Sequence, residues 1–106
     1  MAVIHGDSGN FDKEVKKSKV PVLVDFYADW CGPCRKLGPV LEQLDKEMGG
    51  KLKVVKINVD EARELAAAHE VMHIPALFIY KGGKIVSSDT GSHPLPLLKA
   101  WVEQVL

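Results

Sequence analysis

The sequence predicts a single α/β domain that spans residues 1–106. Its length allows one hydrophobic core, because domains cluster near ~100 to 150 residues. Two apolar, β-branched stretches flank a stretch with helical periodicity, and this strand–helix–strand order predicts a parallel crossover. Two later strand-like stretches are separated by a tight glycine turn, which predicts an antiparallel pair. The sheet should therefore contain both kinds of strand pair.

The crossover is the clearest part of the pattern. Residues 20–28 and 52–59 are almost continuously apolar, as expected of central strands covered on both faces. Between them, apolar residues recur at steps of three and four, and Gly49 and Gly50 end the stretch. The predicted buried face of this helix consists of Cys34, Leu37, Leu41, Leu44 and Met48. Pro39 falls inside the helix and should kink it.

The N-terminal elements are shorter. Val3 and Ile4 predict a small edge strand, and a helix should follow with Phe11 and Val15 on its inner face. We expect Ser8 or Asn10 to cap that helix.

The second half adds two helices and two strands. Asp60 is the expected N-cap of a helix over residues 61–70, which is rich in alanine. Residues 76–80 and 85–88 should form the antiparallel pair around a turn at residues 81–84. A closing amphipathic helix should begin near Pro94 or Pro96 and bury Trp101.

Composition excludes several classes of protein. Hydrophobic residues make up 46% and charged residues 26%, and 14 basic residues balance 14 acidic ones. The zero net charge disfavours nucleic acids and anionic membranes as main ligands. The longest apolar run, residues 74–80, is far shorter than the ~20 residues that a membrane-spanning helix needs. The N-terminal ten residues do not resemble an export signal, so we expect a cytoplasmic protein.

Both cysteines lie in the motif Cys31-Gly32-Pro33-Cys34. A disulfide across so short a loop stabilises a fold little, so the pair indicates transient redox chemistry or metal binding. A zinc site would recruit His69 and His73, which have the spacing of a ligand pair. However, 34 residues separate Cys34 from His69, whereas zinc fingers use about 12 to 15. We therefore expect no metal.

The helical periodicity predicts different places for the two sulfurs. Cys34 begins the buried face, whereas Cys31 precedes the helix at an exposed tip where backbone N–H groups lack partners. The helix N-terminus favours an anion, so Cys31 should ionise readily and act as the nucleophile. Residues three apart in a first helical turn lie roughly 5 Å apart, which permits a disulfide. Pro33 suits the first turn, and Gly32 leaves room for an incoming disulfide, so both should tune the redox potential.

Asp25 is unexpected in a central strand. It shares a strand face with Leu23 and Tyr27, so burial should raise the pKa of its carboxyl group. A neutral carboxyl near Cys34 could exchange a proton with that thiol. The alternative is a structural ion pair with Lys56 on the neighbouring strand, and such a pair would also tune Asp25.

Residues 24–34, with the sequence VDFYADWCGPC, resemble the active-site signature of the thioredoxin family. Ile74-Pro75 and Gly82-Gly83 extend the resemblance, which runs from about Phe11 to the C-terminus. It implies a five-stranded mixed sheet flanked by four helices, in a protein that is expected to be a monomer. It also implies reduction of disulfides in target proteins, with no bound cofactor. Electrons would come from NADPH through a flavin-containing thioredoxin reductase.

The resemblance also assigns residues. It implies that Asp25 deprotonates Cys34 and that Pro75 is cis and lies against the cysteine pair. Proline at a strand start otherwise has an ordinary structural explanation. The resemblance further implies that the Ile74 backbone and Pro75 contact a partner.

Trp30 could be a core aromatic residue, but it directly precedes Cys31 on the exposed turn, so we assign it to partner contact as well. Gly91 should let a partner backbone approach the site.

Two positions depart from the family pattern. Tyr27 stands where tryptophan is common, and Ala76 follows Pro75 where threonine is usual. His73 lies next to Ile74 and is either a modulator of the site or an ordinary surface residue.

We predict that Cys31 attacks a partner's disulfide and that Cys34, helped by Asp25, resolves the mixed disulfide. One alternative is an oxidase or isomerase with the same fold. Another is a binding module whose Trp30, Ile74 and Gly91 surface grips a partner without redox chemistry.

Overall fold

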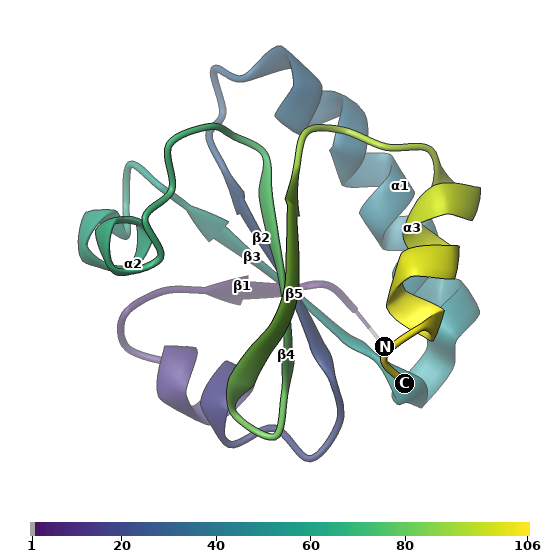
Figure 1. The fold of residues 1–106 in the computed structure, drawn as a ribbon. Helices are drawn as coiled ribbons and strands as arrows, with labels where there is room; N and C mark the ends of the chain where they lie inside the picture. The colour runs from purple at the N-terminus through teal and green to yellow at the C-terminus, as the bar shows by residue number, and fades with distance from the viewer. Residues whose placement is uncertain (1) are drawn as a thin grey trace.

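A five-stranded mixed sheet forms the middle layer of the computed structural model, which describes residues 2–106 (Figure 1). The strand order is β1-β3-β2-β4-β5. β2 and β3 are parallel and β4 and β5 are antiparallel, as the sequence predicts. The structure adds that β1 is parallel to β3 and that β4 is antiparallel to β2. The strands are β1 (Ile4–Gly6), β2 (Val22–Tyr27), β3 (Lys53–Asn58), β4 (Ala76–Lys81) and β5 (Lys84–Thr90).

Helices cover both faces of the sheet (Figure 1). α1 (Gly32–Met48) and α3 (Leu95–Glu103) pack on one face. η1 (Asp12–Lys16), a short π-helical segment, and α2 (Arg63–Ala68) pack on the other. These are the four predicted helices, and one 3₁₀ turn, η2 (Gly49–Lys51), follows α1. α1 continues through Pro39.

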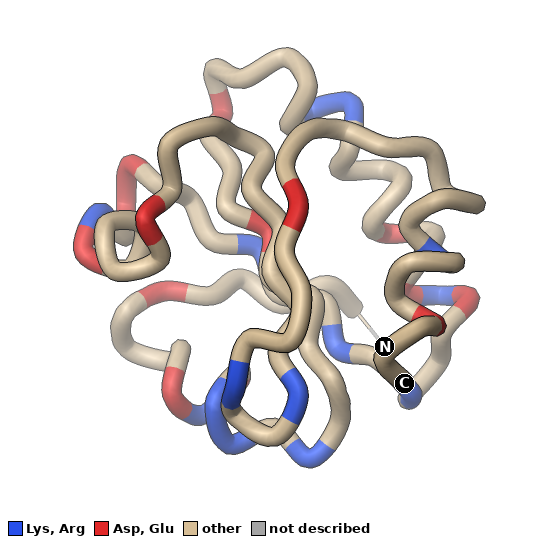
Figure 2. The backbone as a smooth tube through the Cα atoms, in the orientation of Figure 1, with Lys and Arg blue, Asp and Glu red and all other residues tan. Residues whose placement is uncertain are grey.

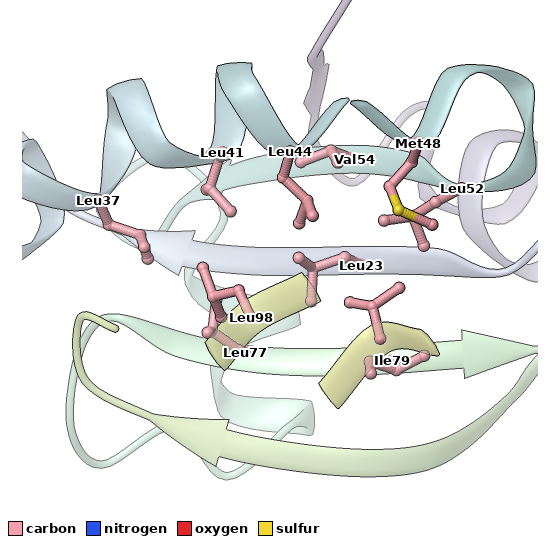
Figure 3. Close-up of a cluster of buried hydrophobic side chains, with 11 residues drawn as sticks. Leu23, Leu37, Leu41, Leu44, Met48, Leu52, Val54, Leu77, Ile79 and Leu98 are labelled. Carbon is pink, nitrogen blue, oxygen red and sulfur yellow. The ribbon is translucent and has the colours of Figure 1, made fainter. Parts of the chain in front are cut away.

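The period of two along β2 divides the core into two layers. Leu23 points toward α1 and packs with Leu37 and Leu41 in the cluster drawn in Figure 3. Val22, Val24 and Phe26 point to the opposite face, into the cluster that contains Phe11 and Val15. By the same alternation, Asp25 shares the α1 face with Leu23.

Two predicted caps are wrong. Asp60 does not cap α2, whose N-cap is Ala62. The carbonyl oxygen of Asn58 accepts N–H bonds from Glu61 and Ala62 in an intervening turn, which delays the helix.

At the N-terminus, neither Ser8 nor Asn10 caps η1, whose N-cap is Phe11. Instead Asp7 Oδ1 accepts N–H bonds from Gly9 and Asn10. The carbonyl oxygen of Asp7 accepts the N–H bond of Phe11, so an aspartate-centred turn replaces the expected cap.

The β4–β5 hairpin requires its two glycines. Gly82 and Gly83 have φ of 61° and 79°, as a tight turn with two left-handed residues demands. A Cβ on Gly83 would lie 2.9 Å from the carbonyl oxygen of Lys16. Figure 2 shows basic segments gathered around this end of the sheet, opposite the β2–α1 turn.

Glu70 is the one non-glycine residue with positive φ among residues 2–106, at 54°. It follows the C-cap of α2, where the backbone N–H groups of Glu70 and Val71 bond back to the carbonyl oxygens of Ala67 and Ala66. Glycine is the residue that this position favours.

We expect Glu70→Gly to raise the free energy of unfolding by about 0.5 kcal/mol. The left-handed conformation costs a non-glycine residue roughly 1–2 kcal/mol, and the greater freedom of glycine in the unfolded chain offsets part of the gain. Urea unfolding measures the difference. The matched control Ala67→Gly, inside α2, should instead lower stability by about 1 kcal/mol. Equal destabilisation by both variants would contradict the assignment.

Candidate active site

Cys31 is the N-cap of α1, and its Sγ accepts the backbone N–H of Cys34 at 3.2 Å. The two residues are joined by a disulfide, and their Cα atoms are 5.2 Å apart. The amides of a first helical turn lack carbonyl partners within the helix. In this turn one of them points at sulfur, which favours negative charge on Cys31 when the pair is reduced.

The two cysteines differ less in exposure than the sequence predicts. Cys31 is 5% exposed and Cys34 is 2% exposed, so the expected exposed tip is covered. Both pack in a small cluster with Ala28, against Tyr27 and Ile74. A tertiary contact causes this burial, because the loop before β4 packs over the turn between β2 and α1.

That loop also provides a groove beside the sulfurs. The Ile74–Pro75 peptide is cis, and Cys31 Sγ lies 3.8 Å from the carbonyl oxygen of Ile74. Gly91, at φ 88°, donates its N–H to the carbonyl oxygen of Pro75 at 2.8 Å. The groove has a volume of 710 Å³, and its lining residues are Gly32, Pro33, Lys36, Ile74, Pro75, Gly91 and Ser92.

The carboxyl group of Asp25 is fully buried on the α1 face of β2. Burial raises its pKa from 3.8 to about 7, and the positive charge of Lys56 opposes that rise. Among residues 2–106, neither carboxyl oxygen has a hydrogen-bond partner.

Asp25 and Lys56 do not form the structural ion pair that the sequence left open as an alternative. The two residues are register partners on β2 and β3. However, Lys56 Nζ lies over the Tyr27 ring, 4.4 Å from its centroid. The cation therefore contacts an aromatic face rather than the carboxylate.

Trp30 is the most exposed aromatic residue of the site, at 68%. Its indole N–H donates to Asp60 Oδ2 at 2.9 Å, a contact that sequence reasoning missed because 30 residues separate the two side chains. His73 is exposed and lines a second cavity of 360 Å³. Trp101 is half-buried and donates its N–H to Ser87 Oγ at 2.8 Å, away from the cysteines.

His69 belongs to the core layer of η1 and α2. Its ring contacts the rings of Phe11, Phe26, Phe78 and Tyr80. Nδ1 donates to the carbonyl oxygen of Leu65, and Nε2 accepts from the Tyr80 hydroxyl at 2.6 Å. Both ring nitrogens thus have protein partners.

Residues 2–106 contain no group of three or more His, Cys, Asp or Glu side chains able to hold a metal ion. In the same part of the chain, no helix combines the length and apolar character needed to cross a bilayer.

A helix-capping dithiol beside a cis-proline groove, on an α/β sheet of this topology, defines a thiol–disulfide oxidoreductase. Comparison with known proteins identifies the family. The thioredoxin family model matches residues 2–104. The chain is 45% identical to a thioredoxin of Bacillus subtilis over 106 residues, which is all of both chains. It is 39% identical to a thioredoxin of Haemophilus influenzae over 102 residues, 96% of this chain and 95% of the relative.

The chain therefore belongs to the thioredoxin family, and its activity is protein-disulfide reduction by dithiol–disulfide exchange. Target proteins with disulfides and a reductase that restores the dithiol are the partners of such a protein in general.

The buried carboxyl predicts that stability depends on pH. Because the folded-state pKa of Asp25 is raised from 3.8 to about 7, the folded chain keeps a proton that the unfolded chain loses. The free energy of unfolding should then fall as pH rises from about 4 to 7 and level off above.

Asp25→Asn should remove that slope and stabilise the oxidised protein at pH 8 by on the order of 4 kcal/mol. Urea unfolding at several pH values measures it. Asp29→Asn, at an exposed neighbouring position, is the control and should keep the slope. A wild-type curve that is flat between pH 4 and 7 would rule out a neutral buried Asp25.

Proposed function

We propose that residues 1–106 form one domain that acts as a monomer in the cytoplasm and reduces disulfides of partner proteins through Cys31 and Cys34. The observation that carries this proposal is the Cys34 N–H directed at Cys31 Sγ at the start of α1. A sulfur that already accepts a hydrogen bond from the helix end is the better anion of the two. A transient cysteine pair suits a reducing compartment.

The reaction then takes two steps. The Cys31 thiolate attacks one sulfur of the target's disulfide, which forms a mixed disulfide and releases the first target thiolate. Cys34 next gives a proton to Asp25 and attacks Cys31 Sγ. The bond between Cys31 and the target breaks, and its electron pair leaves on the second target sulfur. The target gains two electrons, and the cysteine pair is oxidised.

The groove beside the sulfurs is the proposed target-binding surface. The Ile74 carbonyl lies next to Cys31 Sγ, and the open space beside Gly91, where a Cβ would meet nothing within 4 Å, lets an extended segment approach. Trp30 presents an exposed ring fixed by Asp60. We assign Trp30, Ile74, Pro75 and Gly91 to target contact, Gly32 and Pro33 to tuning of the redox potential, and His73 to modulation from the rim.

Recharging requires an external donor. We propose a flavin-containing thioredoxin reductase that uses NADPH, and no cofactor bound to this chain. The reductase's dithiol attacks the Cys31–Cys34 disulfide by the reverse exchange, so the cysteine pair gains two electrons and becomes a dithiol again while the reductase's own pair is oxidised.

Alkylation should separate the two thiols. In the reduced protein, the reaction of Cys31 with iodoacetamide should reach half its maximal rate well below pH 8.5, the value of a free cysteine. Cys34→Ser isolates Cys31 for this measurement, and mass spectrometry locates the adduct. A midpoint at or above that of a cysteine in a flexible peptide would contradict the nucleophile assignment.

Insulin reduction coupled to NADPH and a thioredoxin reductase tests the whole reaction. The wild-type chain should turn over, Cys31→Ser should lose activity, and Cys34→Ser should accumulate a mixed disulfide with insulin that a non-reducing gel detects. If Cys31→Ser formed the same adduct through Cys34, the order of attack would be reversed. A doubly substituted chain that kept full biological activity would instead favour a binding module.

A further inference from the structure

Lys56 is placed where an ion pair with Asp25 would be expected, but its ammonium group lies elsewhere. The two residues face each other across β2 and β3. Lys56 Nζ nevertheless lies 4.4 Å from the centroid of the Tyr27 ring, and neither oxygen of Asp25 has a partner among residues 2–106. The ring that the ammonium contacts belongs to Tyr27, two residues after Asp25 on the same face of β2.

The surroundings explain why the ring can hold the cation. A cavity of 280 Å³, lined by Tyr27, Cys34, Gly38 and Lys56 among others, opens beside the site. A Cβ on Gly38 would lie 3.8 Å from Lys56 Nζ, so glycine in α1 leaves space for the ammonium there. The negative face of an aromatic ring attracts an ammonium group. Moving it onto Asp25 would require further removal of its water in an apolar layer.

We propose that Tyr27 is a positioning residue, whose ring holds the Lys56 ammonium beside Asp25 and off its carboxyl group, so that Asp25 can take the proton of Cys34. This inference rests on the proposed role of Asp25 in resolution. The proton of the Cys34 thiol passes to an Asp25 carboxylate oxygen, and the new Cys34–Cys31 bond displaces the target thiolate. A cation bonded to Asp25 would stabilise the carboxylate and make it a weaker base.

The other groups around Asp25 do not substitute for Lys56. β4 presents Leu77 as its register partner. From α1, Cys34 lines the same cavity, and Arg35 Nη1 donates to the carbonyl oxygen of Asp29 at 2.8 Å. Burial raises the pKa of Tyr27 most, the negative charges of Asp29 and Glu61 add to that rise, and Asp25 adds a smaller effect. Within the described part of the chain, Lys56 is the one charge that lowers the pKa of Asp25, which burial keeps at about 7.

The test combines substitutions of Tyr27 with a substitution of Lys56 in a double-mutant cycle. The Asp25 carboxyl carbon is titrated by NMR in the oxidised wild-type protein, Tyr27→Leu and Tyr27→Phe, each with Lys56 or with Lys56→Met. Tyr27→Leu should lower the midpoint of Asp25 by about one pH unit, because the freed ammonium moves onto the carboxylate. Tyr27→Phe keeps the ring and should keep the wild-type midpoint. With Lys56→Met, Tyr27→Leu should leave the midpoint unchanged.

Two outcomes would overturn the positioning role of Tyr27. One is an unchanged or raised midpoint in Tyr27→Leu. The other is an equal decrease with and without Lys56, which would mean that the substitution acts by admitting water. Lys56→Met alone should raise the midpoint, which checks that Lys56 acts on Asp25 without any change at Tyr27.

A kinetic experiment distinguishes a failure of the positioning role of Tyr27 from a failure of the proposed role of Asp25 as proton acceptor. The resolution of a mixed disulfide formed by Cys31 is followed against pH by stopped-flow fluorescence. In Tyr27→Leu the midpoint of its pH profile should move down with that of Asp25, and the plateau rate should fall about threefold. A shifted Asp25 midpoint with an unchanged resolution profile would overturn the role of Asp25 as proton acceptor.

Discussion

The abrupt passage from β2 to α1 is the constraint on which the site depends. β2 ends at Tyr27 and α1 begins at Gly32, so the chain turns directly from strand to helix and leaves Cys31 at the N-cap. The Cys34 amide has no carbonyl acceptor within the helix, and Cys31 Sγ accepts it. A sulfur that caps a helix is both ordered and biased toward the thiolate.

Sheet topology then places the two loops that carry Pro75 and Gly91 beside the turn between β2 and α1. β4 is antiparallel to β2 and β5 is antiparallel to β4, so the start of β4 and the end of β5 lie at the same edge of the sheet as the end of β2 (Figure 1). Pro75 immediately precedes β4, and Gly91 immediately follows β5. The hydrogen bond between them joins the two loops that form the groove wall, so a fold with this strand order builds the groove without a dedicated insertion.

Local periodicity is sufficient to predict the parallel crossover, the hairpin and the helix that starts at the cysteine pair, because each is encoded within a short stretch of the chain. The full five-stranded sheet comes from the resemblance to a known family. The strict alternation along β2 is likewise enough to place Asp25 on the α1 face. The predictions that are wrong depend on tertiary contacts. The exposure of Cys31 depends on Ile74, which lies 43 residues away, and the partner of Asp60 is Trp30 rather than the helix that follows it. No local pattern reports such contacts.

The position of Lys56 shows the same limit at the level of chemistry. The strand register predicts which residues are neighbours across β2 and β3. It does not predict whether the Lys56 ammonium contacts the carboxyl group of Asp25 or the ring of Tyr27. Lysine has a flexible stem, and its ammonium can reach an aromatic face, a carboxylate or water. Here the ammonium lies over the ring of Tyr27, which is half-buried at the end of the strand.

A buried carboxyl without partners makes the fold less stable than an apolar residue at the same place would. A well-formed ion pair would reduce that cost, but it would also hold the carboxylate charged and remove its affinity for a proton. The arrangement of Asp25, Lys56 and Tyr27 is intermediate, because the cation is close enough to limit the rise in the pKa of Asp25 and too far to bond to it. A pKa of about 7 lets the group both bind and release a proton near neutrality. The same lack of a bonded partner that lowers the stability of the fold at Asp25 is therefore what its proposed role as proton acceptor requires.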